Sequence, residues 1–342
     1  MATIYDVSSR AGVSVATVSA VVNKSSYVSP ALRQRVEEAI RELNYSPNLL
    51  ARGLARQKTL TLGVLVPDIA NFFYPELVRG VEDKAKEAGY TILLGSSDNQ
   101  LDKEEIYLEL FLSKRVDGIV LIKAPCPLNP ALEQRLKKDG PPVVLLGREY
   151  PALSADVVLA DDFDGGFVAT RHLLDLGHRR IGIIRGVSGT STAQDRFRGY
   201  QTALQERHVV LNPDLIAEGD YGLESGYAAG LALLNHNPTA IFVTNYMMTI
   251  GLLRAAEEQK LSCPKDISIV SYDDFIWNDI FPPRLTCVAQ PKYMLGFKAA
   301  EMLISRIQGK HKRPRKEVLE NKLYVRDSSI AVHHASLGRK SL

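Results

Sequence analysis

Nine short apolar runs between residues 60 and 289 constrain the fold of this chain more than any other feature of its sequence. They are mostly flanked by Gly, Asp or Pro, and amphipathic stretches such as residues 76–88, 167–176 and 251–259 lie between them. Near-continuous apolar runs of this kind are typical of strands buried in a parallel sheet. The predicted strands are residues 60–66, 90–94, 116–122, 143–146, 157–159, 181–184, 240–243, 267–270 and 287–289.

Strands that alternate with helices form parallel α/β layers. With this many units, we expect two doubly wound parallel-sheet subdomains with a cleft between them. Ligands of such sheets bind outside the carboxyl ends of the strands. The residues that follow the predicted strands are therefore the candidates for a binding site.

The positive charge of the chain is concentrated at its N-terminal end. Residues 1–58 hold eight Lys and Arg but only four Asp and Glu, a net charge of +4, whereas the whole chain carries +3 at pH 7. This asymmetry suggests a nucleic-acid-binding end attached to a near-neutral body. A basic, solvated face would account for the charge alone.

Two short helices joined by a turn are predicted near the N-terminus. Val7 and Ala11 are four residues apart and share a helix face, and Gly12 can adopt a positive φ and end that helix. Ser14 is a good N-cap for a second helix over residues 15–22. Helices joined by a turn that contains glycine are typical of a helix-turn-helix unit, although other small helical domains share the pattern.

The apolar positions of these helices predict a three-helix core. Val18, Val21 and Val22 form the buried stripe of the second helix. We expect the rest of that helix to face outward: Val15, Ala16, Thr17, Ser19 and Ala20. A third helix should begin at Ser29-Pro30 and complete the core with Leu32, Val36, Ala39, Ile40 and Leu43.

At this point the chain resembles the lac repressor family. The segments TIYDV (3–7), AGVS (11–14), ATVS (16–19) and VVN (21–23) are similar to its headpiece signature, and LNYSPN (43–48) with ARGLA (51–55) to its linker and hinge. The resemblance extends over essentially the whole chain. It implies an all-α helix-turn-helix headpiece (1–46), a linker and hinge helix (47–58), and an effector-binding and dimerisation domain (59–342).

The resemblance also implies the internal division of the larger domain, which would be an α/β periplasmic-binding-protein-like sensor of two doubly wound parallel-sheet subdomains. The N-subdomain would comprise about residues 59–160 and 291–320. The C-subdomain would comprise about residues 161–290 and 321–342.

In the lac repressor family the second helix enters the major groove, and the matching base-reading positions are Val15, Ala16 and Ala20. Arginine, common in the family at the third position, is the commonest bidentate reader of guanine. Its absence indicates apolar contacts, such as with thymine methyl groups. Leu54 matches a hinge leucine that wedges into the minor groove. The other DNA-binding positions implied by the resemblance are Thr3, Tyr5, Ser14, Thr17, Ser19, Asn23, Val28, Ser29, Asn48 and Ala51.

Aromatic and polar residues follow five of the predicted strands, at residues 67–74, 147–149, 189–196, 245–246 and 272–277. Planar aromatics beside Arg and Asp suit a polyhydroxylated or heterocyclic small molecule, although each loop alone could be merely polar. The resemblance implies effector contacts from Phe73, Tyr74, Arg148, Thr190, Thr192, Arg196, Tyr221 and Asp273, to which we add Asn245 and Trp277.

Two departures bear on the ligand. Tyr246 stands where many family members have an Asp that accepts from sugar hydroxyls. Lys123, Arg148 and Arg185 lie at or near strand ends, so their convergence on the cleft would indicate a sugar acid or sugar phosphate. Arg196 could instead form a structural pair with an Asp.

The function predicted from these features is that of a transcriptional regulator, most simply a repressor. Its partners would be double-stranded operator DNA, a small-molecule effector (a sugar, sugar acid or sugar phosphate) and a second copy of the chain. A homodimer reading a palindrome gains the specificity that one small headpiece lacks.

The sequence disfavours two other classes of protein, an enzyme and a solute-binding protein. An enzyme of the doubly wound class is disfavoured because no Gly-x-Gly-x-x-Gly follows the first strand, and no phosphate-binding loop or Gly-x-Ser-x-Gly elbow occurs. We expect no catalytic residue and no cofactor. The solute-binding protein of a transporter would need an export signal and no basic headpiece, and the sequence predicts the reverse.

The cysteines and the apolar stretches predict where the chain works. Cys126, Cys263 and Cys287 are odd in number and widely spaced, without zinc spacing, so we expect no metal site and a reducing, cytoplasmic setting. No stretch reaches the ~20 apolar residues of a membrane helix, so we expect no membrane partner.

Overall fold

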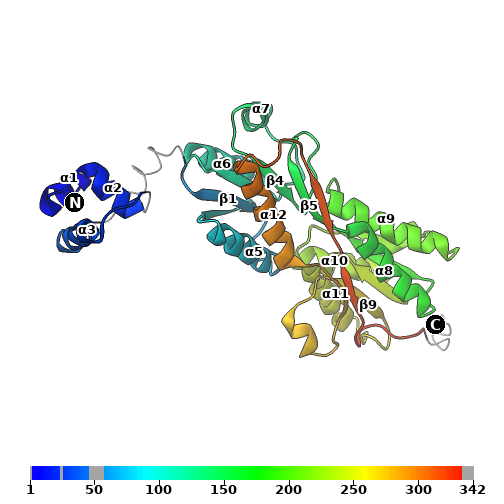
Figure 1. Cartoon of the computed structure of the whole chain (residues 1–342). Helices are drawn as coiled ribbons and strands as arrows, with labels where there is room; N and C mark the ends of the chain where they lie inside the picture. Colours follow the sequence, from blue (N-terminus) through cyan, green and yellow to red (C-terminus); the bar gives the residue numbers. More distant parts are fainter. Residues whose placement is uncertain (1, 24–25, 46–57, 333–342) are drawn as a thin grey trace, which may run out of the picture. The chain divides into compact units, whose positions relative to one another are not determined.

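The computed structural model describes residues 2–23, 26–45 and 58–332. The chain divides into two units, Met1–Leu60 and Thr61–Leu342 (Figure 1). The described part of the first unit holds the helices α1 (Ile4–Ala11), α2 (Val15–Asn23) and α3 (Pro30–Glu42). The predicted hinge residues 48–56 lie outside the described residues.

Local capping sets the bounds of the first two helices. Thr3 and Asp6 form a capping box at the start of α1, in which each side chain accepts from the other residue's backbone N–H. Gly12 ends α1 in the left-handed conformation, with φ 61°. Ser14 Oγ then accepts from the backbone N–H of Thr17 at 3.1 Å and begins α2. The turn predicted between the two helices is confirmed.

The three helices enclose one apolar core, which contains the predicted Val7, Val18 and Val36. One prediction here is wrong. Ala20 does not face outward; it is only 8% exposed and belongs to the core. The core also takes in the segment before α3, where Val28 is buried, and a methyl group as small as that of Ala20 is easily covered.

The second unit contains two six-stranded sheets, as the alternating apolar runs predict. The first sheet has the order β11-β5-β4-β3-β1-β2 and is parallel throughout. Its strands are β1 (Thr61–Val66), β2 (Thr91–Ser96), β3 (Gly118–Leu121), β4 (Val143–Leu146), β5 (Asp156–Ala160) and β11 (Lys316–Leu319).

The second sheet has the order β12-β10-β9-β8-β6-β7 and is parallel except for β12, which runs antiparallel to β10. Its strands are β6 (Ile181–Arg185), β7 (Ile216–Glu218), β8 (Ala240–Val243), β9 (Ser268–Tyr272), β10 (Thr286–Ala289) and β12 (Lys322–Tyr324). All nine predicted strands are present. The three that were not predicted, β7, β11 and β12, lie at sheet edges and are only half-buried or exposed.

Helices cover both sheets. With the first sheet lie α5 (Phe73–Glu87), α6 (Leu101–Ser113), α7 (Pro130–Lys138) and α12 (Lys292–Ile307). With the second lie α8 (Asp162–Asp175), α9 (Ser191–Glu206), α10 (Leu223–Leu234) and α11 (Tyr246–Glu258), and short 3-10 turns occur at Pro213–Leu215 and Ile276–Asp279. No helix among the described residues is long and apolar enough to cross a membrane.

The chain passes between the two sheets three times: after β5, after β10, and between β11 and β12. In Figure 1 the long red segment that runs past both subdomains comprises β11, the last of these connections and β12. Three connections restrict how the subdomains can move against each other. Residues that follow parallel strands of both sheets line a common cleft.

Candidate functional site

The outer surface of the headpiece carries several of the predicted DNA contacts. Tyr5 is 69% exposed, Ser14 and Ala16 are exposed, and Val15 is half-buried. Val28, also predicted at this surface, is instead buried in the core. Thr17, Ser19 and Ser29 are half-buried, while the side chain of Asn23 and all of Asn48, Ala51 and Leu54 lie outside the described residues.

The hydroxyls of Thr3, Ser14 and Thr17 already have partners within the headpiece. Thr3 Oγ1 donates to Asp6 Oδ2 at 2.8 Å, and Ser14 Oγ lies 2.9 Å from Thr17 Oγ1. The hydrogen bonds from the Thr3 backbone and side chain lower the pKa of Asp6. These side chains therefore fix the helix ends, and each hydroxyl oxygen keeps capacity for one further hydrogen bond.

A cavity lies between the two subdomains at the carboxyl ends of their strands; the free space among its lining atoms, open solvent included, is about 570 Å³. We call it the cleft cavity. Its lining comes from both sheets and from the helices that follow them. The lining residues are Asn71, Phe73, Tyr74, Leu77, Ile122, Gly147, Arg148, Thr192, Arg196, Tyr221, Asn245, Asp273, Gln290 and Leu295.

Arg196, on α9, is held on one side of the cleft cavity by three contacts. Its Nε donates to Asp162 Oδ1 at 2.7 Å, and its Nη1 donates to the carbonyl of Thr244 at 2.6 Å. The guanidinium carbon lies 3.7 Å from the centre of the Tyr272 ring. The structural pair considered from the sequence is therefore present, yet Arg196 still lines the cavity.

Arg148, which follows β4 in the other subdomain, is also fixed. Its Nη1 donates to Asn99 Oδ1 and to the carbonyl of Lys123, both at 2.8 Å. The guanidinium lies 5.9 Å from the centre of the Tyr221 ring across the cleft. The two subdomains thus each present one pre-oriented arginine to the same cavity.

Asp273 supplies a buried carboxylate after β9. Its Oδ1 accepts from Gln290 Nε2 at 2.7 Å, and burial raises the pKa of Asp273 against the opposing influence of Arg196. Among the described residues no donor reaches its second oxygen. Asp273 has φ 74° and Tyr221 has φ 71°, a left-handed conformation that costs non-glycine residues about 1 kcal/mol or more and is common at binding sites.

Tyrosines and a threonine complete the polar wall. The Tyr221 hydroxyl lies 3.1 Å from Thr192 Oγ1 and 3.2 Å from Thr190 Oγ1. Burial raises the pKa of Tyr74 to about 12, so its hydroxyl stays protonated at neutral pH. The tyrosine rings provide flat apolar surfaces beside these polar groups.

Eight of the ten predicted effector residues line the cleft cavity, and two do not. Thr190 is buried behind it, where it caps α9 by accepting from Ala193 N. Trp277 instead stacks on Phe275 at 5.2 Å between ring centres and donates to the Tyr246 hydroxyl. Four lining residues were not predicted as effector contacts: Leu77, Ile122, Gln290 and Leu295. Two others, Asn71 and Gly147, lie in predicted strand-end loops but were not named as contacts.

The cations considered for an anionic ligand do not converge. Lys123 is buried against Glu104, with 2.5 Å between Nζ and Oε1. Arg185 lies over the Phe197 ring, 4.0 Å from its centre. Neither lines the cleft cavity, which leaves Arg148 as the one member of that set that does.

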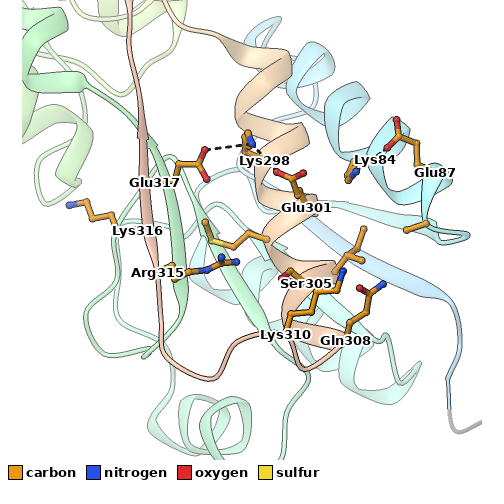
Figure 2. Close-up of a pocket in the computed structure, with 13 residues that line it drawn as sticks. Lys84, Glu87, Lys298, Glu301, Ser305, Gln308, Lys310, Arg315, Lys316 and Glu317 are labelled. Carbon is orange, nitrogen blue, oxygen red and sulfur yellow. Dashed lines mark hydrogen bonds and ion pairs between the residues drawn. The ribbon is translucent and has the colours of Figure 1, made fainter.

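A second and larger hollow, about 1340 Å³, lies between α5, α12 and β11 (Figure 2). We call it the charged groove. Its ionic side chains mostly pair with one another: Lys298 lies between Glu301 and Glu317, and Lys84 pairs with Glu87. Most of these side chains are at least one-third exposed to solvent. None of the predicted site residues lies there.

Two families of known proteins match this chain. Bacterial regulatory proteins of the lacI family match residues 3–48, and the periplasmic binding protein-like domain matches residues 170–329. The HTH-type transcriptional repressor PurR of Escherichia coli O139:H28 is 38% identical over 346 aligned residues, which cover 100% of this chain and 97% of that protein. The chain belongs to the LacI family.

Solved structures agree with this family membership over nearly the whole chain. The lac repressor dimer bound to operator and the anti-inducer ONPF has a TM-score of 0.85 and 29% identity, and covers 96% of this chain and 99% of its own. The complex of the transcriptional regulator CelR with cellobiose has a TM-score of 0.73 and 32% identity, with 96% and 100% covered. This LacI family member is therefore a transcriptional regulator and not an enzyme, as predicted.

Proposed function

We propose that this LacI family regulator represses transcription in the cytoplasm by binding a palindromic operator as a homodimer. A neutral sugar or sugar derivative in the cleft cavity would control its affinity for DNA. The observation that carries the proposal is the pair of fixed arginines, Arg148 and Arg196, that approach one cavity from opposite subdomains. A ligand that contacts both would favour one arrangement of the subdomains over another.

The charges around the cleft cavity support a neutral ligand over an anion. Arg196 is neutralised by Asp162, and the lining of the cavity holds the carboxylate of Asp273 as well as the guanidinium of Arg148. A sugar phosphate would need more positive charge than this, because desolvating two negative charges costs several kcal/mol. A polyhydroxylated ring can donate to Asp273, accept from the arginines and lie against Tyr74 or Tyr221.

The relatives support the same class of ligand and partner. CelR is in complex with cellobiose, and the lac repressor dimer is bound to operator and ONPF. We propose that Tyr5, Ser14, Thr17 and the other phosphate-contact positions dock this headpiece on DNA, and that Val15 and Ala16 read bases by apolar contact. Ala20, buried and without arginine's reach, would contribute little to that reading.

A panel of neutral sugars, sugar acids, sugar phosphates and purines tests the ligand class by thermal shift. A true effector at 100 times its Kd stabilises the folded protein by about 2.7 kcal/mol. Trp277 is the one tryptophan of the chain and packs beside Tyr246, so its fluorescence gives a second readout. We expect neutral sugars to raise the melting temperature. A response confined to sugar phosphates would contradict the proposed charge balance.

Operator binding is tested by selecting sites from random duplexes and measuring affinity against salt. We expect an inverted repeat without an obligatory guanine opposite residue 20. We also expect log Kd to rise linearly with log salt concentration, because phosphate contacts release counterions. Affinity that does not change with salt would contradict the proposed docking surface.

A further inference from the structure

A chain of buried hydrogen bonds runs from the last connection between the subdomains to the wall of the cleft cavity. It begins at Asn321, in the two-residue connection between β11 and β12. Asn321 Nδ2 donates to the Tyr272 hydroxyl at 2.9 Å and to the carbonyl of Asp161 at 2.8 Å. The Tyr272 hydroxyl donates to Asp162 Oδ1 at 3.0 Å, and that same oxygen accepts from Arg196 Nε.

The interior members of this chain are shielded from water. Tyr272 is 0% exposed, and Asp162 and Arg196 are each 6% exposed. Hydrogen bonds to charged groups in such surroundings are stronger than those between neutral groups, and an unmade one costs the full desolvation of its partner. A glycine at position 165 makes the approach possible, because a Cβ there would lie 2.2 Å from the Tyr272 hydroxyl oxygen.

The donors and acceptors fix the direction of each bond. Tyr272 has one hydroxyl proton, and Asn321 Nδ2 has only protons to offer. Asn321 therefore occupies a lone pair of the Tyr272 oxygen and leaves its proton for Asp162. The reversed amide would place Oδ1 of Asn321 against the Asp161 carbonyl oxygen, which is unfavourable. In the observed orientation Oδ1 is buried and has no partner among the described residues.

These hydrogen bonds also lie at the connections between the two subdomains. Asp161 and Asp162 directly follow β5, so they stand where the polypeptide first passes from one subdomain to the other. Asn321 stands in the third such passage. Any change in the angle between the subdomains must be absorbed in these connections, and the same atoms orient Arg196.

One part of Arg196 remains available to a ligand. Nε and Nη1 are engaged by Asp162 and the Thr244 carbonyl, whereas Nη2 has no hydrogen bond from the described residues. Because Arg196 lines the cleft cavity, Nη2 is the nitrogen that can donate there. Its direction depends on where Nε is held.

We propose that Asn321 is a positioning residue for effector binding. Through Tyr272 and Asp162 it sets the orientation of Arg196, and it makes that orientation depend on the connections between the subdomains. This inference rests on the proposed function only in taking the cleft cavity as the effector site. Neither Asn321, Tyr272 nor Asp162 lines the cavity, so each acts through Arg196.

The test follows the Arg196 side chain directly, without a ligand. In full-length protein labelled with ¹⁵N-arginine and deuterated, the Nε–Hε signal of Arg196 is assigned by its loss in Arg196→Lys. Its exchange with water is then measured in Asn321→Ala, Tyr272→Phe and the double variant. Asn212→Ala is the matched control, since the Asn212 side chain accepts from the nearby Asp214 N–H and does not line the cleft cavity.

We expect exchange of the Arg196 Hε to become about fivefold faster in Asn321→Ala and in Tyr272→Phe, the factor that corresponds to one net hydrogen bond. The double variant should be no faster than either single one, and Asn212→Ala should match the wild type. Should Asn321→Ala fail to fold, Tyr272→Phe cuts the same path from the other side.

Unchanged Arg196 exchange in a folded Asn321→Ala or Tyr272→Phe variant would overturn the proposal. Additive effects would also overturn it, because they would mean two separate routes to Arg196. A ligand panel in which nothing binds would contradict the proposed function instead and leave the exchange result standing. The two failures are therefore distinguishable.

Discussion

The cleft cavity and the charged groove differ in how their polar groups are held. The groove is the larger, about 1340 Å³ against 570 Å³. Lys84 and Lys298 are partly exposed and pair with glutamates of their own helices, and Lys298 also lies 3.9 Å from Glu317 of β11. In the cleft cavity, Arg196 and Asp273 are buried, and each is fixed by a partner from another element. Pre-oriented polar groups, more than volume, therefore distinguish the candidate binding site.

The largest expected effect is on the free energy of unfolding, and it comes from Asp156. This residue is fully buried and accepts a hydrogen bond from the backbone of Arg315, which lines the charged groove. Burial alone would raise the pKa of Asp156, but hydrogen bonds from Arg306, His311 and the Arg315 backbone hold it below the ordinary value. Asp156→Asn should lower the free energy of unfolding by about 3 kcal/mol, because it leaves Arg306 without its anion. Urea denaturation measures this, with the exposed Asp139→Asn as control.

The pH dependence of Asp156 has a definite sign. Its pKa is depressed in the folded protein, so its contribution is fully present above the unfolded value of about 3.9 and is lost as pH falls through the folded value. As the pH falls from about 5 towards about 1, the range in which such paired carboxylates titrate, the Asn variant should therefore lose less stability than the wild type. Parallel curves for the two proteins would contradict this assignment.

The next largest effect is expected on effector affinity, which only the cleft cavity should influence. Asp273→Asn keeps the shape of the cleft cavity but removes the carboxylate that would accept from sugar hydroxyls. We expect effector affinity to fall about 10- to 100-fold, as for loss of a charged hydrogen bond. Isothermal titration with the effector from the panel measures it. An unchanged Kd would remove Asp273 from the site.

The same residue predicts how effector binding depends on pH. Burial raises the pKa of Asp273, so it takes up a proton at a higher pH than an ordinary carboxyl of about 3.9. Effector affinity should therefore weaken as pH falls through that raised pKa, while Asp273→Asn should show no such step. A step of equal size in both proteins would assign the titration to another group.

A smaller effect is expected for Tyr221→Phe. The hydroxyl of Tyr221 joins Thr190 and Thr192, and its loss removes about 1 kcal/mol of hydrogen bonding while keeping the ring. Effector affinity should fall about fivefold by titration. A loss as large as that of Asp273→Asn would mean that the hydroxyl contacts the ligand itself.

The smallest effect is expected in the charged groove. Lys310→Ala with Arg315→Ala removes two cations whose side chains form no ion pair within the described residues. Surface substitutions of this kind change the free energy of unfolding by less than about 0.5 kcal/mol. Effector titration and operator binding should both match the wild type. A tenfold change in either would show that the groove is a functional site.

Much of the fold was predictable because buried parallel strands are apolar along their whole length, as in β3 and β4. The edge strands β7, β11 and β12 lack that signal, since half-exposed positions accept Lys and Glu. In the headpiece, Ala20 was placed wrongly because helical periodicity does not show how far the segment before α3 covers α2.

The candidate site was predictable where it follows strand ends, as for Arg148 and Asp273. Its supporting contacts were not, because they join residues far apart in sequence. Asp162 lies 34 residues from Arg196 and 110 from Tyr272, and Asn321 lies 49 from Tyr272. No local pattern marks such partners, nor does any local pattern show that the strand-end residue Lys123 forms a buried ion pair with Glu104.

The central claim is that a ligand in the cleft cavity controls DNA affinity, and one measurement tests it most directly. Operator affinity of the full-length dimer is measured with and without saturating effector, for the wild type and for Asp273→Asn. We expect the effector to change the wild-type Kd by about 5- to 150-fold, a coupling of 1–3 kcal/mol, and to change the Kd of the variant less at the same concentration, because the variant binds the effector more weakly. Equal operator affinity with and without bound effector in the wild type would contradict the claim.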